Sequence, residues 1–284
     1  MAAMTVAGCA GGAAGATPRT GSYAPRGKIE QATTEAWQWI RNHSSLPGGC
    51  GVQDNRWNEA HAAAGTHSQR VFVEDLDGTP AFGWHWRWPT SFDVATYPEV
   101  VCGTKPWDLG GGAWPLGGAL PFQPTTHALE VSYDLASESV GTHNQVFSLW
   151  AVNDPGAPLA SLAAEIMVWI DDVGMTPAGS KQGTVQSGGT TFDVYVDPAQ
   201  RDNSGGTTAT WVYAAFLARS PRLAGPLDFT PLLDWLRDHD LPGSTGQRIL
   251  PDGAWIGSVE LGTEIVGGAG VVEITGFDYQ VIPR

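Results

Sequence analysis

In the stretch Ala163-Ala164-Glu165-Ile166-Met167-Val168-Trp169-Ile170, apolar residues surround a single glutamate. Alternate residues of a β-strand point to opposite faces of its sheet. One face, typical of a protein core, would hold Ala164, Ile166, Val168 and Ile170. The other face would hold Glu165, Met167 and Trp169. Because a solvated sheet surface normally carries small polar or charged residues, this second face predicts a concave cleft in a β-rich fold.

A second glutamate, Glu264, lies in the strand-like segment Val259-Glu260-Leu261-Gly262-Thr263-Glu264-Ile265-Val266. The same alternation puts Glu264 on the non-core face with Glu260 and Gly262, and Gly262 would leave room for a ligand. A carboxylate in an apolar strand is costly unless it has a partner or a task. Two such carboxylates that meet across a sheet are what cleavage of a glycosidic bond requires. The alternative is a pair of ordinary exposed strand carboxylates.

Period-2 alternation recurs along most of the chain and predicts β-strands. The expected strands are 70–74, 128–135, 145–152, 163–171, 190–196, 210–217, 256–266 and 270–281. In 229–239 apolar residues recur at helical spacing instead, with Thr230 as N-cap and Pro231 in the first turn. Many strands, one helix and no βαβ alternation predict an all-β jelly-roll sandwich of two mostly antiparallel sheets. We expect one domain over 28–284, in which 28–42 is either a short helix or irregular chain.

Residues 83–124 form the longest predicted loop region, rich in Trp, Gly and Pro and with little regular periodicity. The tryptophans of this region are Trp84, Trp86, Trp88, Trp107 and Trp114. A loop of this length in a compact domain is more often functional than idle.

Composition narrows the classes of partner. Only 15% of residues are charged, and the chain has 37 Gly, 20 Pro and 13 Trp, which favours a turn-rich β fold. The net charge of −14 argues against nucleic acid and anionic membranes, which need basic surfaces, and fits a neutral substrate. No stretch approaches the roughly 18 apolar residues that span a bilayer. The histidines show no metal-ligand spacing and no phosphate or dinucleotide motif occurs, so we expect no metal and no cofactor.

The three cysteines are Cys9, Cys50 and Cys102. Cys50 and Cys102 lie in the expected folded region, where they either form a disulfide or remain buried free thiols. Val6-Ala7-Gly8-Cys9 resembles a bacterial lipoprotein cleavage site without the apolar run that precedes such a site. It is either part of a signal peptide, with a lipid anchor at Cys9, or a chance match. We expect residues 1–27 to be a disordered segment or tether.

Four stretches resemble glycoside hydrolase family 12, whose members are β-jelly-roll endo-β-1,4-glucanases and xyloglucanases. Residues 164–170 are similar to the nucleophile strand of the family, in which Met and Trp follow the Glu two and four residues on. Residues 261–264, with the glycine-rich run 267–270, are similar to its acid/base strand. Asn55-Arg56-Trp57 is similar to a sugar-binding Asn-x-Trp strand, and Tyr97-Pro98 to a loop that enters the cleft. The resemblance covers roughly residues 50–284, with the helix in the family's position.

The resemblance implies a retaining double displacement with Glu165 as nucleophile and Glu264 as acid/base. Glu264 would stay protonated near neutral pH through partial desolvation and the charge of Glu165, while Glu260 is expected to be solvated. The substrate-binding residues would be Asn55, Trp57, Met167 and Trp169. Trp107 and Trp114 would be either sugar-stacking or packing residues.

The chain departs from the family at a third carboxylate. The family places an Asp near the nucleophile, on the strand before it, where the Asp tunes the pKa of the nucleophile. Phe147-Ser148-Leu149-Trp150 puts Ser148 at that position, and Asp134 is the alternative. Loss of this Asp would lower activity or shift its pH optimum.

The predicted protein is thus an extracellular, monomeric endo-β-1,4-glucanase, or a surface lipoprotein if Cys9 is lipidated. Its substrate would be a cellulose-type glucan, mixed-linkage β-glucan or xyloglucan. One alternative is a β-1,4-xylanase-like hydrolase of a related jelly-roll family. The other is a carbohydrate-binding jelly roll with weakened catalysis, against which the presence of both glutamates argues.

Overall fold

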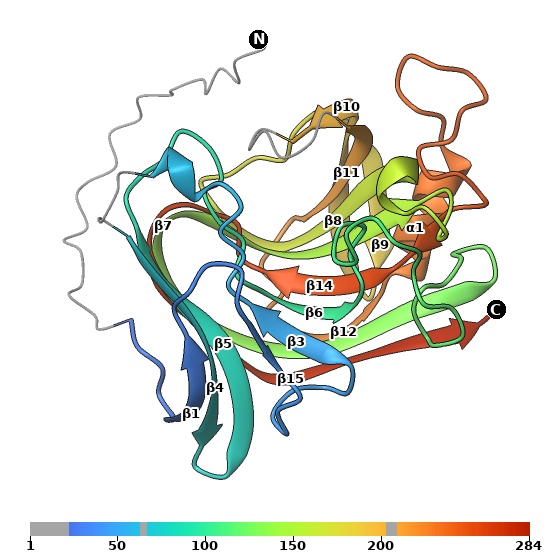
Figure 1. Cartoon of the computed structure of the whole chain (residues 1–284). Helices are drawn as coiled ribbons and strands as arrows, with labels where there is room; N and C mark the ends of the chain where they lie inside the picture. The colour runs from blue at the N-terminus through green and yellow to red at the C-terminus, as the bar shows by residue number, and fades with distance from the viewer. Residues whose placement is uncertain (1–22, 63–66, 203–208) are drawn as a thin grey trace, which may run out of the picture.

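The computed structural model describes residues 23–62, 67–202 and 209–284, and its strands form two layers (Figure 1). The longest strand, β7 (His127–Val152), takes part in both layers. Its first half pairs with β15 (Ile265–Pro283) and β12 (Ala224–Asp228). Its second half pairs with β8 (Leu162–Val173) and β14 (Ser258–Gly262). The two predicted segments 128–135 and 145–152 are therefore parts of one continuous strand.

The first layer continues from β15 through β5 (Thr79–Trp88) and β4 (Ser68–Leu76) to β1 (Lys28–Thr33). On one side of β7, the second layer continues through β14, β6 (Glu99–Gly103), β3 (Cys50–Gln53) and β2 (Trp39–Arg41). On the other side it continues through β8, β11 (Thr210–Ala218), β10 (Thr190–Arg201) and β9 (Ser180–Ser187). All of these pairings are antiparallel except β8 with β11. The mostly antiparallel jelly-roll sandwich is as the sequence predicts.

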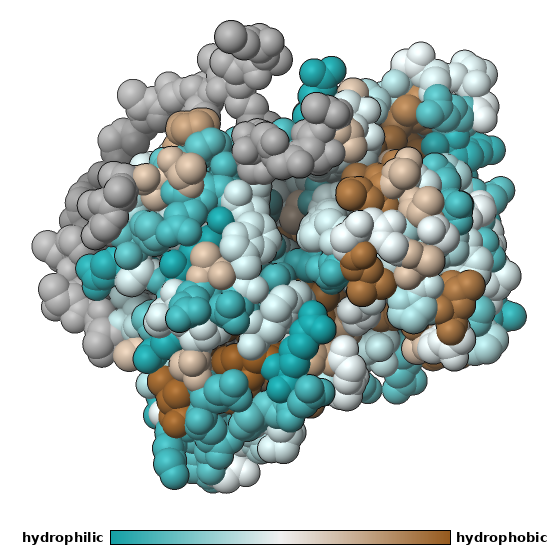
Figure 2. Space-filling model, viewed as in Figure 1, coloured by the Kyte–Doolittle hydropathy of each residue, from teal (hydrophilic) through white to brown (hydrophobic). Residues whose placement is uncertain are grey.

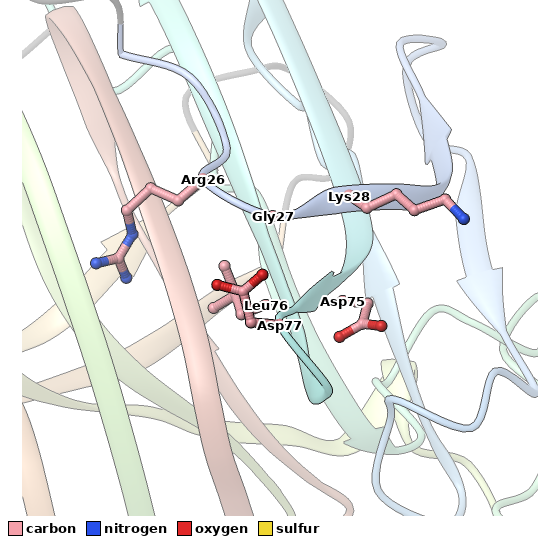
Figure 3. A pocket seen from close by; sticks show the side chains of 6 residues that line it. All are labelled: Arg26, Gly27, Lys28, Asp75, Leu76 and Asp77. Atoms are coloured by element: carbon pink, nitrogen blue, oxygen red, sulfur yellow. The ribbon is translucent and has the colours of Figure 1, made fainter.

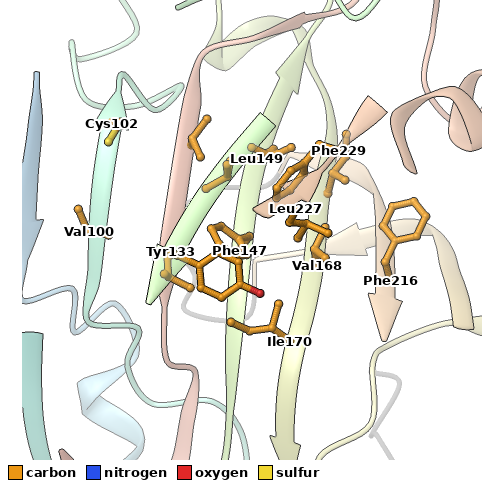
Figure 4. Packing of buried hydrophobic residues seen from close by; sticks show 14 of the residues in the cluster. Val100, Cys102, Tyr133, Phe147, Leu149, Val168, Ile170, Phe216, Leu227 and Phe229 are labelled. Carbon is orange, nitrogen blue, oxygen red and sulfur yellow. The ribbon is translucent and has the colours of Figure 1, made fainter. Parts of the chain in front are cut away.

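The core lies between the layers, where the apolar faces of both sheets meet. Figure 4 shows Tyr133 and Phe147 of β7 packed near Val168 and Ile170 of β8, with Phe229 close by. Ala164, Ile166, Val168 and Ile170 all belong to this core, as the alternation along β8 predicts. Burial of large apolar side chains of this kind contributes roughly 1.5–3 kcal/mol each to folding.

The helix α1 (Thr230–Asp238) is where the helical spacing predicts it. Leu232, Leu233 and Leu236 are fully buried in the core. The predicted N-cap is wrong by one residue, because the cap position is Phe229 and Thr230 is already helical. The side chain of Asp228 instead accepts a hydrogen bond of 2.8 Å from the Thr230 N–H. Short 3₁₀ turns occupy Glu59–His61 (η1) and Leu159–Ser161 (η2).

The tryptophans at the start of the predicted loop region lie in a strand instead. Trp84, Trp86 and Trp88 belong to β5, and their side chains point into the core. Their spacing is itself period-2, but the Gly and Pro residues around them are typical of loops and obscure this signal. β6 also falls within 83–124, so the irregular region is shorter than predicted.

The predicted strand 256–266 is divided in three: β13 (Trp255–Ile256), β14, and the start of β15. Thr263 and Glu264 lie between β14 and β15. The Thr263 hydroxyl donates to Gln145 at 2.7 Å and accepts from the Trp84 indole N–H at 2.8 Å. These buried bonds hold the chain where it passes from one layer to the other.

Cys50 and Cys102 face each other across β3 and β6 and are joined by a disulfide. Cys9 and its lipoprotein-like motif lie outside the described residues. None of the helices in the described ranges is long and apolar enough to cross a membrane.

In the first layer, two buried glutamates accept hydrogen bonds from the chain just before β1. The N–H of Arg26 donates to Glu273 and the N–H of Gly27 donates to Glu74, each at 2.7 Å. Arg26, Gly27 and Lys28 line a pocket with Asp75–Asp77 of the β4–β5 hairpin (Figure 3). This pocket belongs to the first layer.

Candidate active site

Glu165 lies on β8, on the face that points away from the core. Its strand neighbours are Trp150 of β7 and Tyr213 of β11. The indole N–H of Trp211 donates a hydrogen bond of 3.0 Å to Glu165 Oε2. Burial raises the pKa of Glu165 to about 8; the charge of Glu264 adds to the rise and the Trp211 hydrogen bond opposes it. The charge of Glu264 thus acts on Glu165 across the same face.

Glu264 is held by Asn144 of β7 through three hydrogen bonds. The Asn144 side chain donates to Glu264 Oε2 at 2.6 Å and accepts from the Glu264 N–H at 3.0 Å. The Asn144 backbone N–H donates to the Glu264 carbonyl at 3.1 Å. Burial raises the pKa of Glu264 to about 7; the Asn144 hydrogen bond opposes this rise and the charge of Asp93 supports it. The expected cause is therefore only partly right: desolvation raises the pKa of Glu264, but the charge that adds to the rise is that of Asp93 and not that of Glu165.

The remaining side chains of this face form a second apolar cluster, separate from the core. It consists of Tyr97, Val146, Met167, Trp169, Tyr213 and Ala215, with Trp57 packed against it. Met167 and Trp169 therefore share the face of Glu165, as the alternation predicts. In the region where Figure 1 places β8 and β14, the space-filling view shows a hollow in the surface (Figure 2). Two partly buried carboxyl groups thus lie on an aromatic floor.

Comparison with known proteins adds a second line of evidence. The glycosyl hydrolase family 12 profile matches residues 48–281. The chain belongs to this family. Endoglucanase S of Pectobacterium parmentieri is 30% identical over 200 residues, covering 69% of each chain. The protein is thus a glycoside hydrolase of a family with endoglucanases and xyloglucanases among its members.

Solved family 12 structures share the fold. A xyloglucanase from Bacillus licheniformis in complex with ligand aligns with a TM-score of 0.71 at 21% identity, covering 88% of this chain and 99% of that one. Endoglucanase 3 of Trichoderma harzianum aligns with a TM-score of 0.66 at 17% identity, covering 88% and 97%. Endoglucanase Cel12A of Rhodothermus marinus aligns with a TM-score of 0.66 at 21% identity, covering 89% of this chain and 100% of that one.

In this family 12 protein, two expectations about the strand that leads to Glu264 are wrong. The space over Gly262 is filled by the Tyr97 ring, which would be 2.5 Å from an added Cβ, so it does not receive a sugar. The Tyr97 hydroxyl donates to the Val146 carbonyl at 3.0 Å. Glu260 is 1% exposed and therefore not solvated. Both residues are covered by chain that is remote in sequence, which strand alternation cannot reveal.

The tryptophans of the predicted loop have different surroundings. Trp114 is buried, donates to the Lys105 carbonyl at 3.2 Å and packs on Gly257, so it is a packing residue. Trp107 is 38% exposed and lies edge-on to Trp150, with ring centroids 4.8 Å apart. Trp150 in turn lies edge-on to Trp211 at 5.6 Å. An aromatic row therefore runs from Trp107 to the residue that binds Glu165.

Asn55 is buried, and its side chain donates to Glu99 Oε1 at 2.8 Å. Trp57, two residues on, remains partly exposed beside the aromatic cluster. The Asn-x-Trp motif therefore adjoins the cleft, with Asn55 bound to the protein itself.

The two candidates for the third carboxylate position lie in different layers. Asp134 is exposed and pairs with Gly276 in the first layer, away from Glu165. Ser148 lies on the cleft face, between Met167 and Glu260 on the adjacent strands. Its buried hydroxyl has no hydrogen-bond partner among the described residues. Of the two candidates, only Ser148 thus lies on the face of Glu165, and its hydroxyl makes no hydrogen bond to Glu165 within the described residues.

Sequence reasoning missed Asn144, Trp150 and Trp211. Trp150 could have been found, because it alternates with Ser148 on the cleft face of β7. Asn144 lies in a run of buried polar residues, His143, Asn144 and Gln145, for which strand alternation gives no signal. Trp211 reaches Glu165 from β11, beside β8 in the sheet but remote in sequence.

Proposed function

We propose that the protein hydrolyses β-1,4-linked glucan chains internally, with retention of anomeric configuration. Glu165 would attack the anomeric carbon and form a glycosyl-enzyme, while Glu264 protonates the leaving oxygen. Glu264 would then take a proton from the water that releases the sugar. The observation that carries the proposal is the pairing of Glu165 and Glu264 on one aromatic face, each partly desolvated and the charge of one acting on the other.

Two features of the cleft and the names of similar proteins support a glucan substrate. The cleft face is aromatic, and flat apolar rings stack on the faces of sugar rings. Trp57 and Trp107 remain exposed enough to take part in such stacking. Relatives are named as endoglucanases and xyloglucanases. The candidate substrates are therefore cellulose-type glucan, mixed-linkage β-glucan and xyloglucan.

The disulfide between Cys50 and Cys102 supports an extracellular location, because disulfides persist in oxidising compartments. We infer a secreted protein that acts as a monomer outside the cell.

Release of reducing sugar from carboxymethylcellulose, mixed-linkage β-glucan, xyloglucan and xylan tests the proposal. Activity should be highest between the two site pKa values, about 7 and about 8, because Glu165 must be ionised and Glu264 protonated. Release from a β-1,4-glucan supports the proposal, and release from xylan alone indicates the xylanase alternative. Binding without release from any of them indicates a carbohydrate-binding protein and overturns the proposal.

A further inference from the structure

Beside the cleft, three charged side chains are almost completely buried. Glu99, Lys105 and Glu260 are each no more than 1% exposed. The Lys105 ammonium donates to Glu99 Oε1 at 2.5 Å and to the Gln53 side chain at 3.1 Å. Two carboxyl groups thus share one buried ammonium. If both carboxyl groups were ionised, one negative charge would be left unpaired in the interior, which is strongly unfavourable.

The strand register brings the two carboxyl groups together. Glu260 of β14 pairs with Val101 of β6, and Glu99 lies two residues from Val101 on the same face. Diagonal neighbours of this kind are about 7–8 Å apart along the sheet, within reach of two glutamate side chains. One Glu260 oxygen accepts a hydrogen bond of 2.6 Å from the Ser258 hydroxyl. Glu99 Oε2 is buried without a donor among the described residues.

A proton on Glu260 would resolve both problems, because it cancels the unpaired charge and supplies a donor to Glu99 Oε2. Burial raises the pKa of Glu260 well above its usual range; Lys105 opposes the rise and Glu99 adds to it. Burial alone would lower the pKa of Lys105, but the charges of Glu99, Glu260 and Asp108 raise it overall. Tyr97, the other titratable group beside Glu99 and Glu260, has its pKa raised well above 10.0 by burial and by these carboxylates, so it stays neutral.

Glu99 and Glu260, together with Lys105, connect three separate parts of the cleft wall. Glu99 accepts from Asn55 of the Asn-x-Trp motif. Lys105 begins the segment that carries Trp107, and its ammonium lies 5.9 Å from the Trp107 ring centroid. Glu260 is on β14, the strand that leads to Glu264. If the pair were broken, these parts would lose a common anchor.

We infer that Glu99 and Glu260 share a single proton and, with Lys105, form a positioning element that fixes the sugar-binding wall against the acid/base strand. The inference rests on the proposed function for its effect on substrate binding. Glu260 is a positioning residue, since it acts through Asn55 and the Trp107 segment rather than on the sugar.

Two substitutions separate the shared proton from the volume of the side chain. Glu260→Gln copies the protonated form, because its amide can donate to Glu99 and accept from Ser258. Glu260→Leu has a similar volume but leaves Glu99 Oε2 without a donor, while Asn55 and Lys105 still donate to Oε1. On the glucan that the wild type hydrolyses, at pH 6, Glu260→Gln should keep KM within about twofold. Glu260→Leu should raise KM about tenfold or more with kcat within about threefold.

Glu74→Leu is the matched control. Glu74 is also a fully buried glutamate, bound to the Gly27 N–H, but it lies in the first layer, away from the cleft. This variant should lose stability and keep the wild-type KM. The inference is overturned if Glu260→Leu has the wild-type KM. It is also overturned if Glu260→Gln is as impaired as Glu260→Leu, because the pair would then need a second charge rather than a proton.

Melting temperature against pH tests the shared proton without substrate. A carboxyl group whose folded pKa is raised gives stability that is present at low pH and lost as pH rises. The melting temperature of Glu260→Gln should therefore rise relative to the wild type between pH 5 and 9. If the difference in melting temperature between Glu260→Gln and the wild type does not change with pH, Glu99 and Glu260 do not share a proton. If the wild type releases sugar from no glucan, the proposed function fails, while this measurement still decides on the pair.

Discussion

Trp211 donates its indole N–H to Glu165 across 3.0 Å, from a strand that runs parallel to the one carrying Glu165. Within the described ranges this is the one hydrogen bond to the Glu165 carboxylate. Glu264, in contrast, exchanges three hydrogen bonds with Asn144, one with its carboxylate and two with its backbone. For Glu165 the charge of Glu264 outweighs the Trp211 hydrogen bond, whereas for Glu264 the Asn144 hydrogen bond outweighs the charge of Asp93. The pKa of Glu165, about 8, is therefore raised further than that of Glu264, about 7. Without the third carboxylate, an indole N–H does most to keep the proposed nucleophile ionised.

Trp211→Phe should lower the maximum of the kcat/KM profile and move its alkaline limb, which the higher of the two site pKa values sets, to higher pH. The hydrogen bond lowers the pKa of Glu165, so its loss raises that pKa and less enzyme is ionised at a given pH. A hydrogen bond to a charged group is worth about 1.5–3 kcal/mol, so we expect a shift of about one pH unit. Trp150→Phe is the control, since Trp150 packs on Trp211 without bonding to Glu165. If the limb set by Glu165 stays at its wild-type pH in Trp211→Phe, the Trp211 hydrogen bond does not control the pKa of Glu165.

Asp93→Asn should lower the maximum of the kcat/KM profile and move its acidic limb, which the lower of the two site pKa values sets, to lower pH. The Asp93 charge raises the pKa of Glu264, so its removal lets Glu264 lose its proton earlier. Backbone hydrogen bonds from Ser91 to Val266 and from Ala95 to Ile265, each 2.8 Å, place Asp93 beside Glu264. Asp134→Asn should leave both limbs unchanged, because Asp134 is exposed in the other layer. If Asp93→Asn and Asp134→Asn shift the pH profile equally, the net charge of the protein, and not the position of Asp93 beside Glu264, causes the shift.

Ser148→Asp should not simply restore the family pattern. The new carboxyl group would be buried directly opposite Glu260, with Cβ atoms about 4.5–5.5 Å apart. Desolvation would raise its pKa, so its contribution to stability is present at low pH and lost as pH rises. The melting temperature of Ser148→Asp should therefore fall below that of Ser148→Asn progressively between pH 5 and 8. Identical melting curves of the two variants at every pH would show that the site is solvated.

Reduction of the disulfide should lower the free energy of unfolding by about 2–4 kcal/mol. The bond links residues 52 apart in sequence and joins β3 to β6, which carries Glu99. Thermal melting with and without a thiol reductant measures the effect, and Cys50→Ala with Cys102→Ala should reproduce it. If thiol titration of the unfolded, unreduced protein finds both cysteines free, the disulfide is absent.

The fold and the face of the strand that carries Glu165 could be predicted because alternation is a local property. Along β8 it separates Glu165, Met167 and Trp169 from the core, and every one of these positions lies where predicted. The helix followed from its own periodicity as well, with an error only at Thr230.

The contacts that tune the site could not be predicted in this way, because they come from other strands. Asn144 reaches Glu264 from β7, Trp211 reaches Glu165 from β11, and Tyr97 covers Gly262. Glu260 alternates like an exposed residue, yet Lys105 and Glu99 bury it. Pairing and covering by remote segments decide these environments, and one sequence gives little information about them.

The most direct test of the central claim is to trap the glycosyl-enzyme. A 2-deoxy-2-fluoro-cellobioside with a good leaving group slows hydrolysis of the covalent intermediate, so the label accumulates on the nucleophile and can be located by peptide mass spectrometry. We predict one sugar per protein, attached to Glu165, and no labelling of Glu165→Gln. A label on Glu260 or Glu264, or an α-configured first product from a β-glucan, would contradict the assignment of Glu165 as the nucleophile of a retaining enzyme.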